Sequence, residues 1–248
     1  MERYFFLLLL AIHVFIAKAQ LDETLLPATG EREQLIHHKG FSLSYNPSYV
    51  QPSWVAYKVS ESRVIADEVK GKYRADPMVT SRSADKKDYK EGGYIMAQFV
   101  NYLDIKNIPD AVEESFFMTN ITPMKLAYYK HIWLKIEELV RLWSKDPEGL
   151  FVVCGAILSD APFPTIGDNK VSVPTRYYKA VYDPENHRAI GFIFRNGMSS
   201  GKLSSYAVSI DEIEKETGLD LFPSLEDDLE ERVESEVNFS SWDFELIE

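Results

Sequence analysis

The chain has 248 residues, of which 45% are hydrophobic and 27% charged, and it carries a formal net charge of −12. This length and composition suit one large soluble globular domain or two small ones. The single cysteine, Cys154, excludes an internal disulfide, so the stability of the fold has to come from a buried core.

The negative charge is concentrated at the C-terminus. Between residues 226 and 248 there are ten acidic residues and one basic residue, Arg232, a net charge of −9. The rest of the chain carries −3, so the overall charge does not exclude a polyanionic ligand held in a local basic groove. We expect residues 226–248 to be an acidic tail that forms a frayed helix or is disordered.

The first twenty residues are typical of a secretory signal. Arg3 precedes an apolar run from Tyr4 to Ile16, and the small residues of Ala17-Lys18-Ala19 suit a signal peptidase. The run is shorter than the roughly 20 residues that span a bilayer. The sequence therefore predicts a signal peptide at residues 1–19, no membrane anchor after its cleavage, and a secreted or periplasmic location.

Apolar runs, alternating or continuous, predict the strands. In chain order these are Phe41–Tyr45, Trp54–Val59, Gly93–Val100, Glu114–Asn120, Leu150–Leu158, Tyr177–Tyr182 and Ala189–Phe194. The first two are expected to be antiparallel neighbours, and the last two flank Asp183-Pro184-Glu185-Asn186 as a hairpin. The stretch between residues 60 and 93 is polar, and a loop of that length is usually functional.

Two helices are predicted. The longer helix, Lys125–Trp143, consists of strong helix formers and is expected to start at Thr122-Pro123. Its apolar stripe comprises Leu126, Trp133, Ile136, Leu139, Val140 and Trp143. A shorter helix begins with a capping box at Ser209 and stops at Gly218. Since strands and helices do not alternate regularly, we predict an α+β domain over residues 20–225 with a mixed or antiparallel sheet.

Several short motifs follow one another in a specific order. They are Trp54-Val55-Ala56-Tyr57, Asp76-Pro77, Asp88-Tyr89, Thr119-Asn120-Ile121-Thr122-Pro123, Trp133 with Glu137, Val173-Pro174, Tyr178-Lys179, and Ile213-Glu214 with Thr217-Gly218-Leu219. Each is weak alone, but in this order, from about Phe41 to Phe222, they resemble the secreted DNA/RNA non-specific endonucleases. The resemblance implies a strand–strand–helix core of the ββα-metal (His-Me finger) type, a Mg²⁺ cofactor and a nucleic acid substrate.

The chemistry of that family sets two requirements. Phosphodiester hydrolysis needs a general base whose pKa lies near the working pH, which in the family is the histidine of an Asp-Arg-Gly-His segment. It also needs a divalent cation to offset charge on the phosphate. In the family an asparagine holds that cation, four residues before the tryptophan of the following helix, and an amide oxygen suits Mg²⁺.

This sequence departs from the family at both positions. The Asp-Arg-Gly-His segment aligns with Ile95-Met96-Ala97-Gln98, and the amide of Gln98 cannot accept a proton near neutral pH. Tyr129 stands four residues before Trp133, and a neutral phenol is a poor magnesium ligand. The resemblance therefore implies a catalytically degenerate member that does not bind Mg²⁺.

Three residues of the resembled site are retained: Asn120, Glu137 and Arg141. They are similar to the supporting groups of the family, not to its base or its metal ligand. Glu137 and Arg141 are also four residues apart on the predicted helix, so the alternative is an ordinary ion pair worth a few tenths of a kcal/mol.

Basic residues near the resembled site are candidates for substrate binding. The arginine that the family has five residues before its Asp-Pro aligns with Gly71, which Lys70 and Lys72 flank. With Lys90 and Arg141, these lysines are expected to contact nucleic acid or another phosphate-bearing ligand, with an affinity that falls steeply with salt.

The leading interpretation is a pseudonuclease that binds nucleic acid or another ligand in the former active-site cleft. One alternative is an active metal-dependent endonuclease that uses rearranged residues, for which Asp104 and Asn107 are candidates. A second is a protein-interaction scaffold, in which Ile95 and Met96 make the cleft apolar.

Overall fold

The computed structural model describes residues 21–60, 69, 71–108, 110–145, 148–197 and 200–247. The predicted signal peptide at residues 1–19 and the candidate ligand-binding residue Lys70 lie outside these ranges. Within them, no helix has the length and apolar character needed to cross a membrane.

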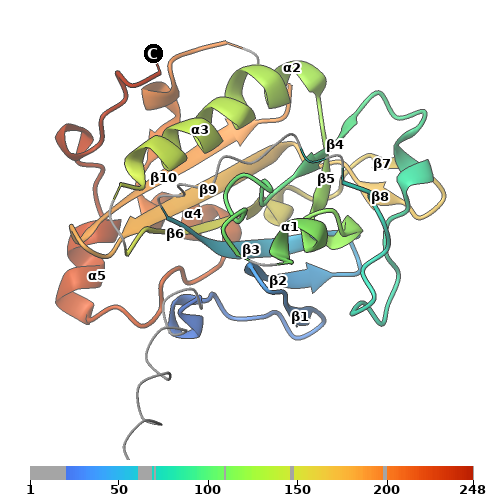
Figure 1. Ribbon diagram of the computed structural model, residues 1–248, viewed down its shortest axis with the longest axis horizontal. Coiled ribbons are helices and arrows are strands. Elements are labelled where there is room, and N and C mark those ends of the chain that lie inside the picture. The colour runs from blue at the N-terminus through green and yellow to red at the C-terminus, as the bar shows by residue number, and fades with distance from the viewer. Residues whose placement is uncertain are drawn as a thin grey trace, which may run out of the picture.

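A seven-stranded sheet forms the centre of the part of the chain that the structure describes (Figure 1). In spatial order its strands are β1 (Gln34–His37), β2 (Phe41–Asn46), β3 (Gln51–Val59), β6 (Leu150–Ala156), β9 (Arg176–Asp183), β10 (Arg188–Arg195) and β11 (Ala207–Val208). Every neighbouring pair is antiparallel, and β9 and β10 form the predicted hairpin. Two short antiparallel pairs stand apart: β4 (Ile95–Gln98) with β5 (Ile121–Met124), and β7 (Thr165–Ile166) with β8 (Val171–Ser172).

The central strands are buried on both sides. In β3, Val55 and Tyr57 belong to one hydrophobic core, whereas Trp54 and Ala56 belong to a second core on the other face. This alternation follows from the two-residue period of a strand. A sheet with two apolar faces must be covered twice, and the structure supplies a helical layer on each side.

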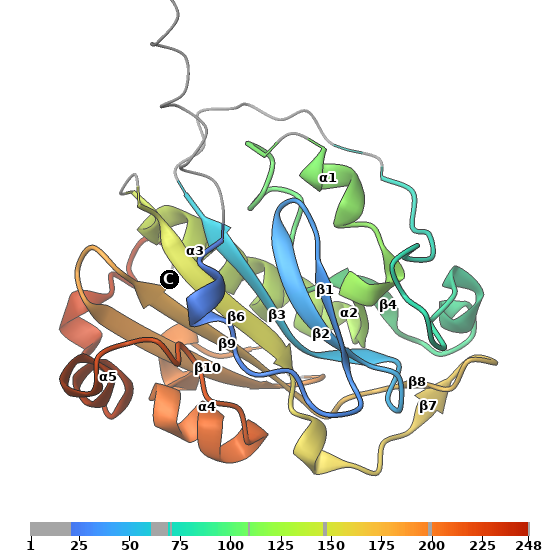
Figure 2. The same ribbon diagram turned by 90° about the horizontal axis from the view of Figure 1, so that it is seen from below.

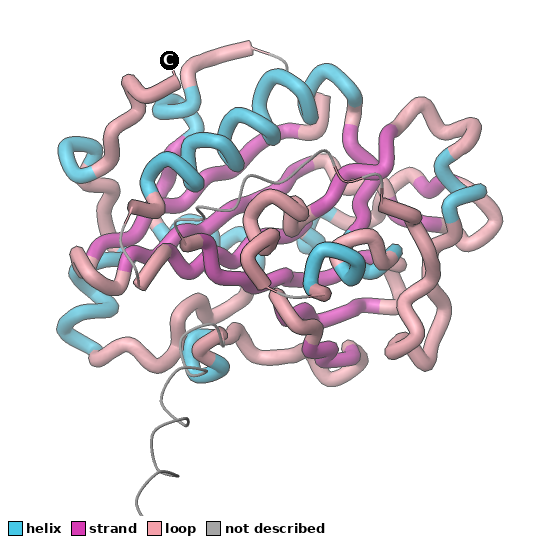
Figure 3. The backbone as a smooth tube through the Cα atoms, in the orientation of Figure 1, coloured by secondary structure: helices cyan, strands magenta, loops and turns pink. Residues whose placement is uncertain are grey.

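The helices are α1 (Ala111–Glu114), α2 (Leu126–Tyr128), α3 (Leu134–Trp143), α4 (Ile210–Thr217) and α5 (Asp227–Glu234). A five-residue π-turn, Tyr129–Trp133, joins α2 to α3 in one helical run across one face of the sheet (Figure 3). The short helices α4 and α5 cover the opposite face (Figure 2). Of the predicted capping box the structure shows the Ser209 half: its side chain accepts a hydrogen bond from the Glu212 backbone, and Gly218 ends α4 at a φ of 73°.

Two expectations around β5 are wrong. Residues 114–120 do not form a strand: Glu114 ends α1, and Met118–Asn120 form a 3₁₀ turn before the strand starts at Ile121. Thr122 and Pro123 lie in β5 and do not start the helix, which begins at Leu126. Proline is tolerated there because β5 pairs on one side only. Leu126 is 50% exposed, so it does not contribute to the apolar stripe.

The acidic C-terminal segment packs on the domain, contrary to the expected frayed helix or disorder. After α5, Trp242 is 2% exposed, and its ring centroid lies 4.7 Å from that of Trp143. The Trp143 indole N–H donates to the Asp243 carbonyl at 2.8 Å, and the Arg188 guanidinium carbon lies 4.3 Å from the Trp242 ring centroid. A few aromatic anchors therefore outweigh the charge that predicted disorder.

Replacing Trp242 with alanine tests this docking. The Trp242→Ala variant should lose about 3–5 kcal/mol of unfolding free energy, because truncating a buried tryptophan leaves a cavity. The matched control is Phe239→Ala, because Phe239 is 50% exposed and should matter little. Urea unfolding followed by circular dichroism measures both, and equal stabilities would contradict a docked tail.

Candidate active site

The pair β4–β5 and the following helical run form a strand–strand–helix unit. Gln98 ends β4 opposite Ile121 of β5, and the indole N–H of Trp133 donates to the Gln98 carbonyl oxygen at 3.2 Å. This bond fixes the helical run to the end of β4. It therefore brings the positions expected for the base, Gln98, and the supporting carboxylate, Glu137, to the same end of the unit.

The side chains of Gln98 and Asn120 are both used in bonds to the backbone. The Gln98 amide donates to the carbonyl and the hydroxyl of Ser115, at 2.9 and 3.1 Å. The Asn120 amide donates to the carbonyls of Ser115 and Val100, and its oxygen accepts from the Val100 N–H. Both residues are buried, so their visible role is to hold the segments on either side of α1.

Glu137 is the buried carboxylate of the site. It is 1% exposed, and its Oε2 accepts a hydrogen bond from the Asn101 amide at 2.9 Å, whereas its Oε1 has no partner among the described residues. Burial, followed by the negative charge of Asp104, raises the pKa of Glu137 to about 7, against the opposing effects of Lys179 and Arg141. A group with such a pKa can exchange a proton near neutral pH.

Arg141 does not pair with Glu137 within the described part of the chain. Its guanidinium donates to Asp104 at 2.6 Å, and the Asp104 side chain is 2% exposed. The i,i+4 ion pair considered from the sequence is therefore replaced by two contacts from the helix to the segment after β4, through Asn101 and Asp104. The other candidate for a rearranged metal site, Asn107, donates to the Ser60 hydroxyl instead.

Lys179 completes this group of charges, and sequence reasoning used it only as a motif marker. It is fully buried on β9, where its Nζ donates to the Tyr57 hydroxyl at 2.9 Å and lies 4.6 Å from the Trp133 ring centroid. A lysine in the middle of an otherwise apolar strand was the available signal. With Glu137, Asp104 and Arg141 it forms a set of two negative and two positive groups, which we call the charge network.

Two tyrosines, Tyr73 and Tyr102, lie close enough to Tyr129, the position expected for the metal ligand, to influence its phenol. Tyr129 is partly exposed, and burial, followed by the charge of Glu137, raises its pKa, so its phenol stays neutral. The ring of Phe116 stacks with Tyr102 at 6.3 Å and meets Tyr73 edge-on at 5.5 Å. A Cβ added at Gly71 would lie 2.1 Å from the Phe116 ring. An arginine at that position would therefore require Phe116 to move. We call Tyr73, Tyr102, Phe116 and Tyr129 the aromatic group.

The predicted basic contacts are only partly brought together. Lys72 is exposed directly before Tyr73 and therefore lies beside the aromatic group. Lys90 is also exposed, but it follows a segment tied to the β7–β8 hairpin, where Asp88 accepts a hydrogen bond from the Asn169 amide at 2.9 Å. Exposed Arg74 lies near Lys72 in sequence, with its guanidinium carbon 4.4 Å from the Phe117 ring centroid, and was not among the predicted contacts.

The side chains at the expected positions do not fit the Mg²⁺ ion that the resemblance implies. The Asn120 amide oxygen already accepts a hydrogen bond from the Val100 N–H, the Gln98 side chain is held to Ser115 through its amide nitrogen, and Tyr129 offers only a neutral phenol. Oε1 of Glu137 is a buried acceptor without a partner among the described residues, but it is subject to the positive charges of Lys179 and Arg141. A divalent cation at that oxygen would be repelled by these two positive charges, and it would lack the several free oxygen ligands that it needs.

The raised pKa of Glu137 predicts a pH-dependent stability. Because that pKa lies above its ordinary value of 4.5, the folded protein binds the proton more tightly than the unfolded chain does. The contribution is fully present below pH 4.5 and is lost as the pH rises through about 7. Between about pH 5 and pH 8 the unfolding free energy should fall by on the order of 2 kcal/mol from this group.

Urea titrations at several pH values measure this dependence. In the Glu137→Gln variant the unfolding free energy should no longer show this decrease with pH. The Glu138→Gln variant, changed on the exposed side of the same helix, should show the same decrease as the wild type. Identical pH profiles for the wild-type protein and Glu137→Gln would contradict the assignment.

The chain is similar to several known nucleases. It is 29% identical over 231 residues to the mitochondrial nuclease EXOG of Xenopus laevis, and the alignment covers 85% of this chain and 64% of that relative. It is 24% identical to nuclease C1 of Cunninghamella echinulata, over 79% of this chain and 86% of that protein. The chain thus spans slightly less than two thirds of the EXOG relative.

The predicted secreted or periplasmic location is contradicted by these relatives. The EXOG proteins of Xenopus laevis, Danio rerio, Mus musculus and Homo sapiens are named mitochondrial, as is a Saccharomyces cerevisiae nuclease that is 23% identical. The physical reason for the error is that a short apolar N-terminal run indicates a targeting segment without identifying the machinery that reads it.

The structural comparison agrees with the α+β architecture. A crystal structure of the complex of EndoG with EndoGI matches with a TM-score of 0.70 at 20% identity, over 77% of this chain and 86% of that chain. The family model for DNA/RNA non-specific endonucleases matches residues 24–228, which include β4, β5 and the helical run. The chain therefore belongs to the DNA/RNA non-specific endonuclease family.

Proposed function

We propose that this protein is a non-cleaving member of its family that binds single-stranded nucleic acid at the former active site. The observation that carries the proposal is the hydrogen bonding of Gln98. Its amide is bound to Ser115, at the position where hydrolysis would require a free base. Tyr129, at the expected metal position, is a neutral phenol, which adds to the same argument.

The pKa of Glu137, raised to about 7, suits general-base catalysis, but the position of this residue argues against that role. It is 1% exposed, and it lies on α3 one turn after the fully buried Trp133. A base must reach the attacking water directly or through one water molecule. Its carboxylate instead offsets buried positive charge within the charge network.

Nuclease activity is the direct test of this proposal. Purified protein incubated with supercoiled plasmid and Mg²⁺ or Mn²⁺ should leave the plasmid intact, because loss of a general base alone costs about 10²–10⁴-fold in rate. A purified EXOG nuclease serves as the positive control. Cleavage that disappears in the Glu137→Gln variant, with its fold checked by circular dichroism, would establish an active enzyme with rearranged residues.

The aromatic group supports binding of single-stranded nucleic acid. Tyr73, Tyr102 and Tyr129 are partly exposed, and bases stack on such rings with little dependence on sequence. Exposed Lys72 and Arg74 flank Tyr73 and supply positive charge for the phosphates. The acids of α5 do not oppose this locally, because that helix lies on the other face of the sheet (Figure 2).

Fluorescence anisotropy with a labelled single-stranded oligonucleotide measures this binding. Tyr102→Ala should weaken it about 5- to 100-fold, in line with the 1–3 kcal/mol of one base–aromatic stack, and affinity should fall with salt. Phe239→Ala removes an exposed ring after α5 and should leave binding unchanged. Absence of binding at low salt would favour the protein-interaction scaffold instead.

A further inference from the structure

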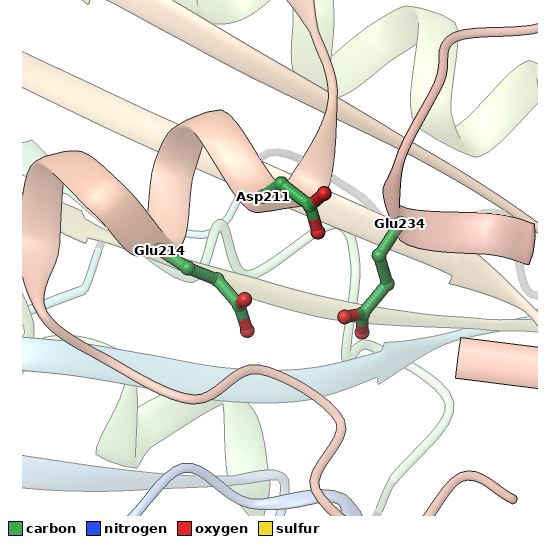
Figure 4. Close-up of side chains that lie close together, drawn as sticks. All are labelled: Asp211, Glu214 and Glu234. Atoms are coloured by element: carbon green, nitrogen blue, oxygen red, sulfur yellow. The ribbon is translucent and has the colours of Figure 1, made fainter. Parts of the chain in front are cut away.

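Three carboxylates meet on the face of the sheet opposite the helical run. Asp211 and Glu214 come from α4 and Glu234 from the end of α5, and all three point toward a common centre (Figure 4). One oxygen from each residue lies within 4.8 Å of the other two. Glu214 belongs to one of the family motifs, Ile213-Glu214, but Asp211 and Glu234 do not, and the cluster therefore needs an explanation of its own.

Glu234 is the unusual member of this cluster. It is 3% exposed, and its Oε1 is buried with no hydrogen-bond partner in the described ranges. A buried carboxylate oxygen without a partner costs several times the value of an ordinary hydrogen bond. Figure 4 shows this carboxylate directed at Asp211 and Glu214, so the unsatisfied group faces further negative charge.

The charges of the described residues that act most strongly on Glu234 are all negative. Burial, followed by the charges of Glu214, Glu230, Asp211 and Asp220, raises the pKa of Glu234 to about 9. Glu214 is partly satisfied, since it accepts a hydrogen bond from the Leu221 backbone at 2.6 Å. Acids from α4, from α5 and from the segment between them therefore converge on one buried oxygen.

We propose that Asp211, Glu214 and Glu234 form a calcium-binding site that joins α4 to α5. Ca²⁺ takes six to eight oxygen ligands at about 2.3–2.6 Å, so two oxygens on one ion lie at most about 5 Å apart, and the cluster meets that limit. Its ligands are all carboxylates, which suit a hard cation and not a metal that prefers histidine or cysteine. Asp220 is near enough to add charge, and water completes the coordination.

The site has a structural role in this arrangement. Val233, next to Glu234, is buried in the same core as Ile210 and Ile213 of α4. The ion would neutralise repulsion between the two helices and fix the acidic segment on the sheet. Because the cluster lies across the sheet from Gln98 and Tyr129, this proposal does not depend on the proposed function, and either can fail alone.

Calcium binding to the full-length protein tests the site. Equilibrium dialysis with radioactive calcium should give one ion per chain, and the melting temperature should rise by about 5–10 °C when calcium is 100 times Kd, relative to EGTA. Mg²⁺ should give a smaller rise, because it demands shorter and more regular octahedral coordination. An equal response to Mg²⁺, or no bound calcium, would overturn the assignment.

Substitutions separate a calcium site from carboxylates that share protons. Glu234→Gln should abolish calcium binding without loss of stability in EGTA, since the raised pKa of Glu234 keeps its carboxyl neutral when no ion is bound and glutamine is neutral with nearly the same shape. Asp211→Asn, at an exposed ligand, should weaken calcium binding at least tenfold while the fold is undisturbed. Glu231→Gln, exposed on α5, should bind as the wild type does. If Glu234→Gln and Asp211→Asn bind calcium as tightly as the wild type, the carboxylates are not its ligands.

Discussion

The buried ammonium of Lys179 is the constraint on which the arrangement of the site depends. A charge removed from water costs several kcal/mol unless an opposite charge and hydrogen bonds offset it. The central sheet supplies the Tyr57 hydroxyl, and the helical run supplies the Trp133 ring and the charge of Glu137. The sheet and the helical run must therefore pack in one relative position, because in any other position the buried charge of Lys179 would lack a compensating partner.

The same constraint gives Glu137, Asp104 and Arg141 a role in stability that does not depend on the chemistry of Gln98 or Tyr129. Glu137, Asp104 and Arg141 balance one another and Lys179, so removing one would leave an unpaired buried charge. Gln98 and Tyr129 lie outside this balance. The Gln98 side chain is used in a hydrogen bond to the backbone, and the Tyr129 ring is partly buried.

The buried charges on the two faces of the sheet are arranged differently. Under the helical run, buried charges of both signs are paired within the charge network. Under α4 and α5, only acids converge on Glu234, and the structure offers them no cation from the described chain. The acidic C-terminal segment nevertheless docks, through Val233 and Trp242, because local apolar contacts outweigh its average charge.

The sequence by itself determined the family, the α+β class, most strands and the long helix, since these depend on local periodicity and on motif order. It misassigned residues 114–120, because apolar character cannot distinguish a buried turn from a strand. Only the tertiary structure decided the partner of Arg141, the covering of Gly71 by Phe116, and the meeting of Asp211 with Glu234. The physical reason is that these contacts join residues distant in sequence, and packing alone selects them.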